Sequence, residues 1–119
     1  MYVFAHGAGA GMNHPFMQRA SDALHARGIA THRFDFPYMK AGKSRPDSPA
    51  VAEAAVREAV AAAARAAPGV PLFAGGKSFG GRMTSQAQAK APLPGVRGLV
   101  FFGFPLHPPG RPGVERAEH

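Results

Sequence analysis

The stretch Gly76-Lys77-Ser78-Phe79-Gly80 decides how this chain folds. It follows an apolar run at residues 70–74 and precedes a segment, residues 80–90, with the composition of a helix. A G-x-S-x-G pattern between a strand and a helix is typical of a nucleophile elbow, a sharp turn that strains the backbone of its central residue. Glycines flank that residue because side chains there would collide. The pattern therefore predicts that Ser78 is a catalytic nucleophile held above the end of a strand.

Length and composition limit the classes of protein to consider. The 119 residues suffice for at most one domain, and 45% of them are hydrophobic and 18% charged, as in globular chains. No apolar stretch approaches the roughly 18 residues of a membrane span, and residues 1–6 lack the features of a signal peptide. We therefore expect a cytoplasmic location by default. The absence of cysteine excludes disulfides, thiolate metal sites and a cysteine nucleophile.

The formal net charge is +7 and the pI is near 10.9, which raises the question of an anionic partner. Lysine and arginine are scattered along the chain, and no run reaches the five or six like charges of a basic tail. We therefore expect no nucleic-acid partner. The six histidines lack metal-ligand spacing, so we predict neither a metal nor a cofactor.

Hydrophobic periodicity predicts alternating strands and helices. The expected strands are residues 2–5, 29–34, 70–74 and 96–102, and the expected helices are residues 13–27, 49–66 and 80–90, with Asn13 and Ser48 as N-caps. This order indicates an α/β fold: a three-layer sandwich of about four parallel strands and about three helices that cover both faces of the sheet. Residues 35–47 are predicted to be an exposed loop, and the proline-rich residues 105–112 are predicted to be irregular. The fourth strand looks buried on both faces.

A second motif supplies what a serine nucleophile needs, which is a pair of backbone N–H donors for an oxyanion. His6-Gly7-Ala8-Gly9 follows the first strand, and its glycines let the backbone approach a substrate oxygen. The N–H groups of Ala8 and Phe79 are the natural pair. A plain glycine-rich turn is the alternative reading of this loop taken alone.

Four segments resemble a known family. They are His6-Gly7-Ala8-Gly9-Ala10-Gly11-Met12 with His14-Pro15-Phe16-Met17, then Arg33-Phe34-Asp35-Phe36-Pro37-Tyr38, then Gly75 to Met83, and then Gly103 to Pro112. The chain resembles the small α/β-hydrolases described as dienelactone-hydrolase-like. The resemblance implies a partial α/β-hydrolase fold, a Ser78 nucleophile, and an oxyanion hole at Phe79 and Ala8. It also implies hydrolysis of a small ester, thioester or lactone through an acyl-enzyme.

The chain departs from the family at its ends. Family members continue beyond the last matching segment, where they carry the catalytic acid and then the histidine. After Ser78 this chain has only Glu115 and Glu118 as acids and His107 and His119 as histidines. We therefore expect residues 1–119 to form a single domain that is incomplete at the C-terminus and also at the N-terminus. The alternative function is a truncated, catalytically inactive hydrolase-fold module that acts through binding.

The remaining polar residues near the two motifs have open roles. His107 is the candidate surrogate base, because its loop leaves the sheet near the strand ends. His6, Lys77 and Arg82 are candidate substrate-side residues. The alternatives are hydrogen bonds within the loop for His6 and His14, and solvated charges for Lys77 and Arg82. Asp35 is expected to form a salt bridge with Arg33 or Arg82, or an Asx turn before Pro37.

Two rival motifs fail on spacing. A P-loop would need its first glycine at position 71, which is Pro71, and a dinucleotide fingerprint would need a third glycine where Met12 or His14 stands. The sequence also leaves residues 96–102 as an apolar edge strand, which invites homo-oligomerisation. The identity of the substrate does not follow from the residues.

Overall fold

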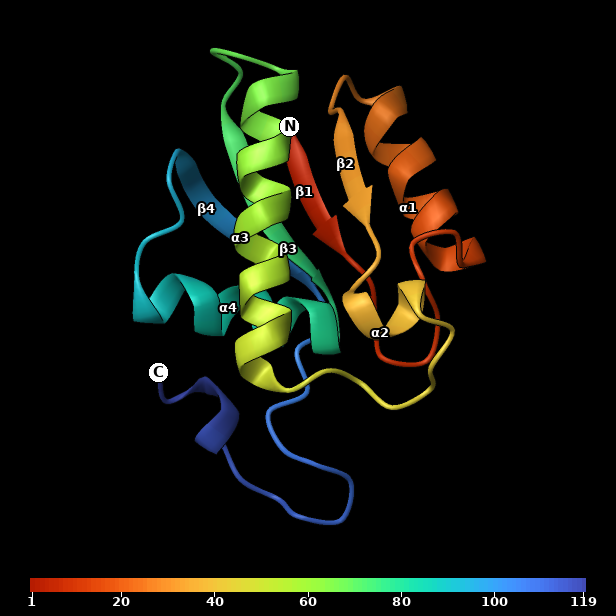
Figure 1. Ribbon diagram of the computed structural model, residues 1–119, viewed down its shortest axis with the longest axis vertical. Coiled ribbons are helices and arrows are strands. Elements are labelled where there is room, and N and C mark those ends of the chain that lie inside the picture. The colour runs from red at the N-terminus through yellow and green to blue at the C-terminus, as the bar shows by residue number, and fades with distance from the viewer.

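Residues 1–119, all described by the computed structural model, form a four-stranded parallel sheet with helices on both faces (Figure 1). The strands are β1 (Tyr2–Ala5), β2 (Thr31–Phe34), β3 (Leu72–Lys77) and β4 (Val96–Phe102), in the spatial order β2-β1-β3-β4. The α-helices are α1 (Pro15–Ala26), α2 (Pro37–Lys40), α3 (Pro49–Ala66) and α4 (Phe79–Lys90), and a 3-10 turn, η1, covers Glu115–Ala117. The predicted α/β class is confirmed, with one short helix more than expected.

The strand order explains where a site can form. The chain leaves β1 in one direction to reach β2, and then returns past β1 to reach β3 and β4. Since parallel crossovers are right-handed, this reversal puts α1 on one face and α3 and α4 on the other. The carboxyl ends of β1 and β3 lie side by side, with Ala5 opposite Gly76. The reversal directs the loops that follow these two strands away from each other. Ligands of open α/β sheets bind at such a switch point.

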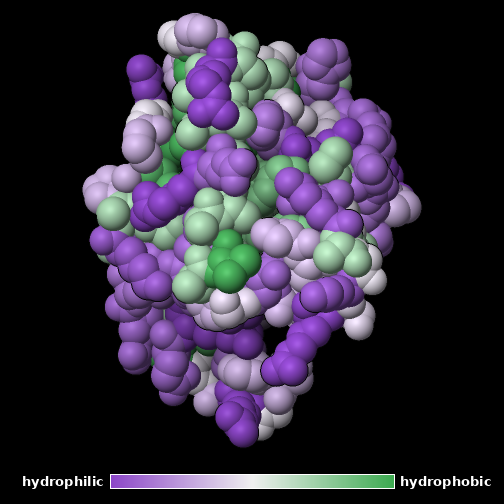
Figure 2. All heavy atoms as spheres, in the orientation of Figure 1, coloured by the Kyte–Doolittle hydropathy of each residue, from purple (hydrophilic) through white to green (hydrophobic).

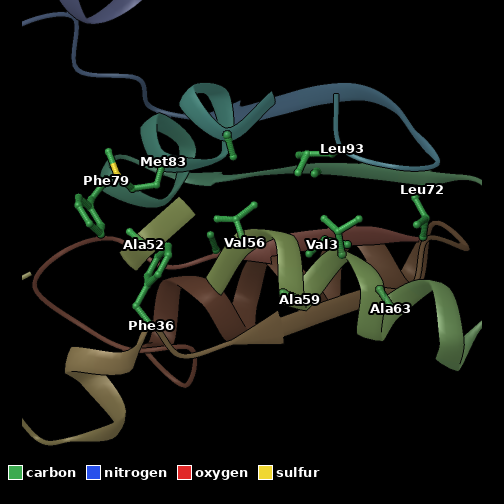
Figure 3. Packing of buried hydrophobic residues seen from close by; sticks show 14 of the residues in the cluster. Val3, Phe36, Ala52, Val56, Ala59, Ala63, Leu72, Phe79, Met83 and Leu93 are labelled. Carbon is green, nitrogen blue, oxygen red and sulfur yellow. The ribbon is translucent and has the colours of Figure 1, made fainter. Parts of the chain in front are cut away.

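The main core lies between the sheet and the helices α3 and α4. Figure 3 shows Ala52 and Val56 of α3 facing Phe79 and Met83 of α4, with Val3 of the sheet beside them. A smaller cluster of Tyr2, Phe4 and Met17 packs α1 against the opposite face of the sheet. The three predicted layers are therefore present.

Polar contacts join α3 to α4 at the rim of this core. The nearly buried Glu53 carboxylate lies 2.9 Å from the Lys90 ammonium group. Arg57 donates through Nη2 to the carbonyl oxygens of Ala87 and Ala91, at 2.5 and 2.7 Å, and so satisfies acceptors at the end of α4.

None of the helices, including the long α3, combines the length and the hydropathy needed to cross a lipid bilayer.

Several local expectations were wrong. Residues 35–47 are not simply an exposed loop, because Pro37–Lys40 form a helical turn in which Tyr38 is buried. The N-cap of α1 is His14 rather than Asn13: its ring accepts a hydrogen bond from the Phe16 N–H. Ser48 is the N-cap residue of α3, as predicted, but its side chain makes no capping hydrogen bond. Strand β3 begins later than predicted and continues to Lys77, so the turn starts directly at the serine.

Strand β4 has the predicted boundaries but not the predicted burial. It lies at the edge of the sheet, and Val100 and Phe101 are 45% and 37% exposed. On the side of α1, an apolar groove of about 300 Å³ runs beside it, lined by Tyr2, Leu24, Ile29, Phe73, Val100 and Phe102. On the face shown in Figure 2, hydrophilic residues cover most of the surface and hydrophobic ones form small patches between them.

The turn after β3 lies directly against the end of β1. A Cβ on Gly76 would collide with the carbonyl oxygen of Ala5, and a Cβ on Gly80 would lie only 2.5 Å from the carbonyl oxygen of His6. Both obstacles are backbone atoms of a central strand or its end, which cannot yield as a flexible side chain would. The two flanking glycines of the G-x-S-x-G pattern are therefore required by packing.

Gly80→Ala is expected to lower the free energy of unfolding by about 1–3 kcal/mol, because the added methyl group overpacks a rigid backbone contact. Gly9→Ala is the matched control, since a Cβ there meets nothing within 4 Å. Urea denaturation followed by circular dichroism measures both. Equal stability of the two variants would contradict the close approach.

We propose that the exposed edge of β4 supports self-association. Val100→Lys should then shift the chain towards the monomer, because a charge on an edge strand opposes pairing with another strand. Val51→Lys on α3 is the control, since Val51 has the same exposed fraction of 45%. Sedimentation velocity at micromolar concentration reads out the oligomeric state; a wild-type chain that is entirely monomeric there overturns the proposal.

Candidate active site

Ser78 has the backbone conformation that the sequence pattern predicted for a nucleophile elbow. Its φ is 54° and its ψ is −113°, and it is the only non-glycine residue with a positive φ. Such a conformation is unfavourable by about 1–3 kcal/mol and persists only where its surroundings enforce it. The Ser78 N–H donates to the Gly103 carbonyl at 2.9 Å, and the Ser78 carbonyl accepts from the Arg82 N–H at 3.0 Å. The turn is thus fixed from both sides.

The glycine loop after β1 and the turn after β3 meet at one cleft. The cleft has a volume of about 420 Å³ and is lined by Gly7, Ala8, Gly9, Ala10, His14, Met17, Lys77 and Ser78. Phe79 is the first residue of α4, so its N–H has no acceptor within that helix. The positive end of the helix therefore lies beside Ser78. The structure brings Ala8 and Ser78 together as the sequence analysis proposed.

The segment after β2 holds the glycine loop in place. Asp35 accepts a hydrogen bond from the Met12 N–H at 2.8 Å, and Arg33 donates to the Met12 carbonyl at 3.0 Å. Asp35 thus does not form the salt bridge with Arg33 or Arg82 that we expected. Its negative charge satisfies a backbone donor of the loop instead, which ties the loop to the end of β2.

His6 is not a substrate-side residue, because its side chain is fully buried. The Phe36 N–H donates to its Nε2 at 3.0 Å, so the neutral ring carries its proton on Nδ1, which donates to the Gly7 carbonyl at 2.7 Å. Burial lowers the pKa of His6, an effect that the Gly7 contact and the Asp35 carboxylate, 3.8 Å away, partly oppose. The expected hydrogen bond within the loop is therefore present.

The two basic candidates have different positions. Lys77 lines the cleft, and its ammonium group lies 4.9 Å from the centre of the Phe16 ring, a cation–π contact. Arg82 is not among the residues that line the cleft. Its Nε is buried without a hydrogen-bond partner, and burial, reinforced by the charge of Arg116, lowers the pKa of its guanidinium. Lys77 is thus the only formally charged side chain that lines the cleft.

The histidines of the tail lie outside the cleft. His107 is exposed, and its Nδ1 donates to the Pro108 carbonyl at 2.9 Å. His119 lies 2.7 Å from the hydroxyl of Ser85, at an exposed position further along α4. Glu115 and Glu118 are also exposed. None of these four residues lines the cleft, so the structure does not place a base or an acid of a catalytic triad beside Ser78.

Sequence reasoning did not assign His14 or Met17 to the cleft. It expected His14 only to hydrogen-bond within the loop, whereas the His14 ring bonds to Phe16 in α1. His14 and Met17 lie at the start of α1, directly after the glycine loop, and that position was the available signal. His14 accepts a hydrogen bond at Nδ1 from the Phe16 N–H at 3.1 Å. The neutral ring therefore carries its proton on Nε2, which makes that atom a donor rather than a base.

Acidification is expected to destabilise the protein through His6. The pKa of His6 is lower in the folded chain than its ordinary value of 6.5, so the unfolded chain binds the extra proton first. The free energy of unfolding should fall as the pH drops below about 6.5, by at most about 1.4 kcal/mol per pH unit for this one proton. Urea denaturation between pH 7 and pH 5 measures the slope, and His6→Asn should make it shallower. An identical slope in that variant would contradict this assignment.

Comparison with known proteins gives a result at the level of the family. The family model described as an alpha/beta hydrolase domain matches residues 1–119. The searches of curated proteins and of solved structures found no match. The matched range covers the whole sheet, the glycine loop and the serine turn. The chain therefore belongs to this family of alpha/beta hydrolase domains.

Proposed function

We propose that the chain carries the nucleophile and the oxyanion hole of a serine hydrolase that acts on a small ester, thioester or lactone. The observation that carries the proposal is the positive φ of Ser78, which a serine adopts only at an energetic cost. Its position across the cleft from Ala8 supports the same reading. The alpha/beta hydrolase family is consistent with this chemistry.

The proposed reaction begins with attack of the Ser78 hydroxyl oxygen on the substrate carbonyl carbon. A bond forms between these two atoms, and the carbonyl electron pair moves onto oxygen. The N–H groups of Phe79 and Ala8 donate to this oxyanion, and the adjacent N-terminus of α4 stabilises its charge. The oxyanion then collapses, the bond between the acyl carbon and the ester or thioester heteroatom breaks, and the leaving oxygen or sulfur takes up the proton that the Ser78 hydroxyl has lost. Water then adds to the acyl carbon, which releases the carboxylic acid and restores the Ser78 hydroxyl.

The proton acceptor is the open part of this mechanism. His107 remains the proposed base, because its Nδ1–H donates to the Pro108 carbonyl, which in the neutral ring leaves Nε2 as the acceptor. Residues 103–112 would have to bring it to the cleft. A second function, binding of an ester-type ligand without turnover, is favoured by one observation: His14 is the only histidine that lines the cleft, and its acceptor nitrogen is already occupied by the Phe16 N–H.

Labelling with a fluorophosphonate tests the nucleophile. The Ser78 oxygen displaces fluoride from phosphorus, and Ser78→Ala should reduce labelling to background, since loss of a serine nucleophile reduces turnover by about a million-fold in well-studied hydrolases. Ser85→Ala is the matched control, because Ser85 also lies on α4 and pairs with a histidine. Intact-protein mass spectrometry counts the adduct.

The labelling result separates the two functions. Labelling that depends on Ser78 and is lost in His107→Gln supports the hydrolase with His107 as base. A folded wild-type chain that takes no label contradicts the hydrolase proposal and favours the binding module. Labelling that depends on Ser85 instead would show that the wrong serine has been assigned.

A further inference from the structure

We propose that Tyr38 and His6 are positioning residues that orient the N–H donors of the glycine loop by fixing two successive peptide groups. The inference rests on the proposed function, because it assigns a role to residues behind the oxyanion hole. Neither side chain lines the cleft. Each of the two side chains donates a hydrogen bond to a carbonyl oxygen of the loop. The N–H group of the same peptide points to the opposite side, and its orientation is therefore set by that bond.

The first peptide group joins Gly7 to Ala8. His6 donates from Nδ1 to the Gly7 carbonyl at 2.7 Å, and the His6 ring is fully buried. In a trans peptide group the C=O and the following N–H point in opposite directions. When His6 holds the Gly7 carbonyl towards the interior, the Ala8 N–H must point away from it. Ala8 lines the cleft together with Ser78, so this N–H is available to a substrate oxygen.

The second peptide group joins Ala8 to Gly9. The Tyr38 hydroxyl donates to the Ala8 carbonyl at 2.8 Å, and the Tyr38 side chain is also buried. The same geometry directs the Gly9 N–H away from Tyr38. Two consecutive carbonyls are thus held by the protein interior. A loop that alternates glycine and alanine has little stiffness of its own, so these two bonds supply the orientation.

Both positioning side chains are themselves held by the segment after β2. The Phe36 N–H fixes the tautomer of His6 by donating to Nε2 at 3.0 Å. The Tyr38 N–H donates to Asp47 at 3.0 Å, and the Tyr38 ring packs edge-on against Phe79. Burial, with the charges of Asp47 and Asp35, raises the pKa of the Tyr38 hydroxyl, which therefore stays a neutral donor. In Figure 1, α2 lies beside the loop that follows β1, as this arrangement requires.

Tyr38→Phe is the sharpest test, because it removes one hydroxyl and keeps the ring in the core. Removal of a whole oxyanion donor reduces turnover by about 10²–10³, so misorientation of one should slow phosphonylation of Ser78 by about tenfold. The loss should fall on the maximal inactivation rate and not on the half-saturating concentration. Tyr2→Phe is the matched control: Tyr2 is equally buried, and its hydroxyl donates to the Val100 carbonyl at 2.7 Å, in the sheet rather than in the loop.

The two substitutions should lower the melting temperature by similar amounts, since each removes one hydroxyl-to-carbonyl bond in the interior. Only Tyr38→Phe should slow phosphonylation. Equal rates in the two variants would overturn the positioning role, because a merely structural hydroxyl would behave like that of Tyr2.

A pair of substitutions at His6 separates its two nitrogens. The amide nitrogen of His6→Asn can take the place of Nδ1 and keep the bond to the Gly7 carbonyl, whereas His6→Gln places its amide group nearer to Nε2. If orientation of the Gly7–Ala8 peptide group matters, His6→Asn should retain more Ser78 reactivity than His6→Gln. The opposite order, in variants that remain folded, would contradict the proposal for His6.

A measurement that does not depend on any reaction of Ser78 separates this inference from the proposed function. Residual dipolar couplings of the Ala8 and Gly9 N–H vectors report the orientation of both peptide groups in solution. We expect them to change in Tyr38→Phe and to remain as in the wild type in Tyr2→Phe. Unchanged couplings in Tyr38→Phe overturn the inference even if Ser78 is reactive. Changed couplings in a chain that takes no label support it and reject only the hydrolase proposal.

Discussion

The fold of this chain depends on a close contact between two pieces of backbone. The turn after β3 presses on the carbonyl oxygens at the end of β1, at a distance that only hydrogen atoms on Gly76 and Gly80 allow. This contact aligns the carboxyl ends of the two central strands. Ser78, which lies between these two glycines, adopts a positive φ. The strain at one residue is therefore stabilised by the packing of the whole sheet.

A second layer of contacts extends from the same place. The end of β2 and the segment after it, residues 33–38, contact the glycine loop through Arg33, Asp35, Phe36 and Tyr38. Every one of these contacts uses a backbone atom of the loop or the ring of His6, which itself holds the loop. Two sets of contacts therefore shape the cleft. The sheet places the serine, and the segment after β2 gives the otherwise pliable loop one conformation.

The elements that carry strong local signals could be predicted from the sequence. The G-x-S-x-G pattern predicted the elbow at Ser78, and the boundaries of β4 were predicted because glycine and proline mark its start and its end. The position of β4 at the sheet edge was predicted, but the expectation that it is buried on both faces was wrong, because the apolar composition of a strand does not show whether a neighbour covers it. Tyr38 was assigned to an exposed loop because the nearby prolines and lysines are typical of loops. Its burial depends on Ala8 and Phe79, which are distant in sequence.

In the candidate site, too, residues within local motifs could be proposed from the sequence, whereas features that depend on distant contacts could not. Ser78, Ala8 and Phe79 were proposed from two motifs, each of which is compact in sequence although the two lie about 70 residues apart. The interior position of His6 did not follow, because a histidine beside glycines is equally compatible with substrate contact and with a buried hydrogen bond. Only the donor from Phe36 decides between them. His14 was missed as a cleft residue because the direction in which α1 leaves the loop is a tertiary property.

The positions of Ala8 and Ser78 in the chain also bear on how the molecule folds. The loops that carry them are separated by about 70 residues of sequence, and they meet only when β3 docks against β1. That docking has to overcome the entropy of closing a long loop, so the cleft forms late relative to local helices such as α3. A nascent or partly unfolded chain therefore carries an ordinary serine in a relaxed backbone. The strained conformation of Ser78 belongs to the closed sheet as a cooperative unit, and it forms with completed folding rather than with the motif alone.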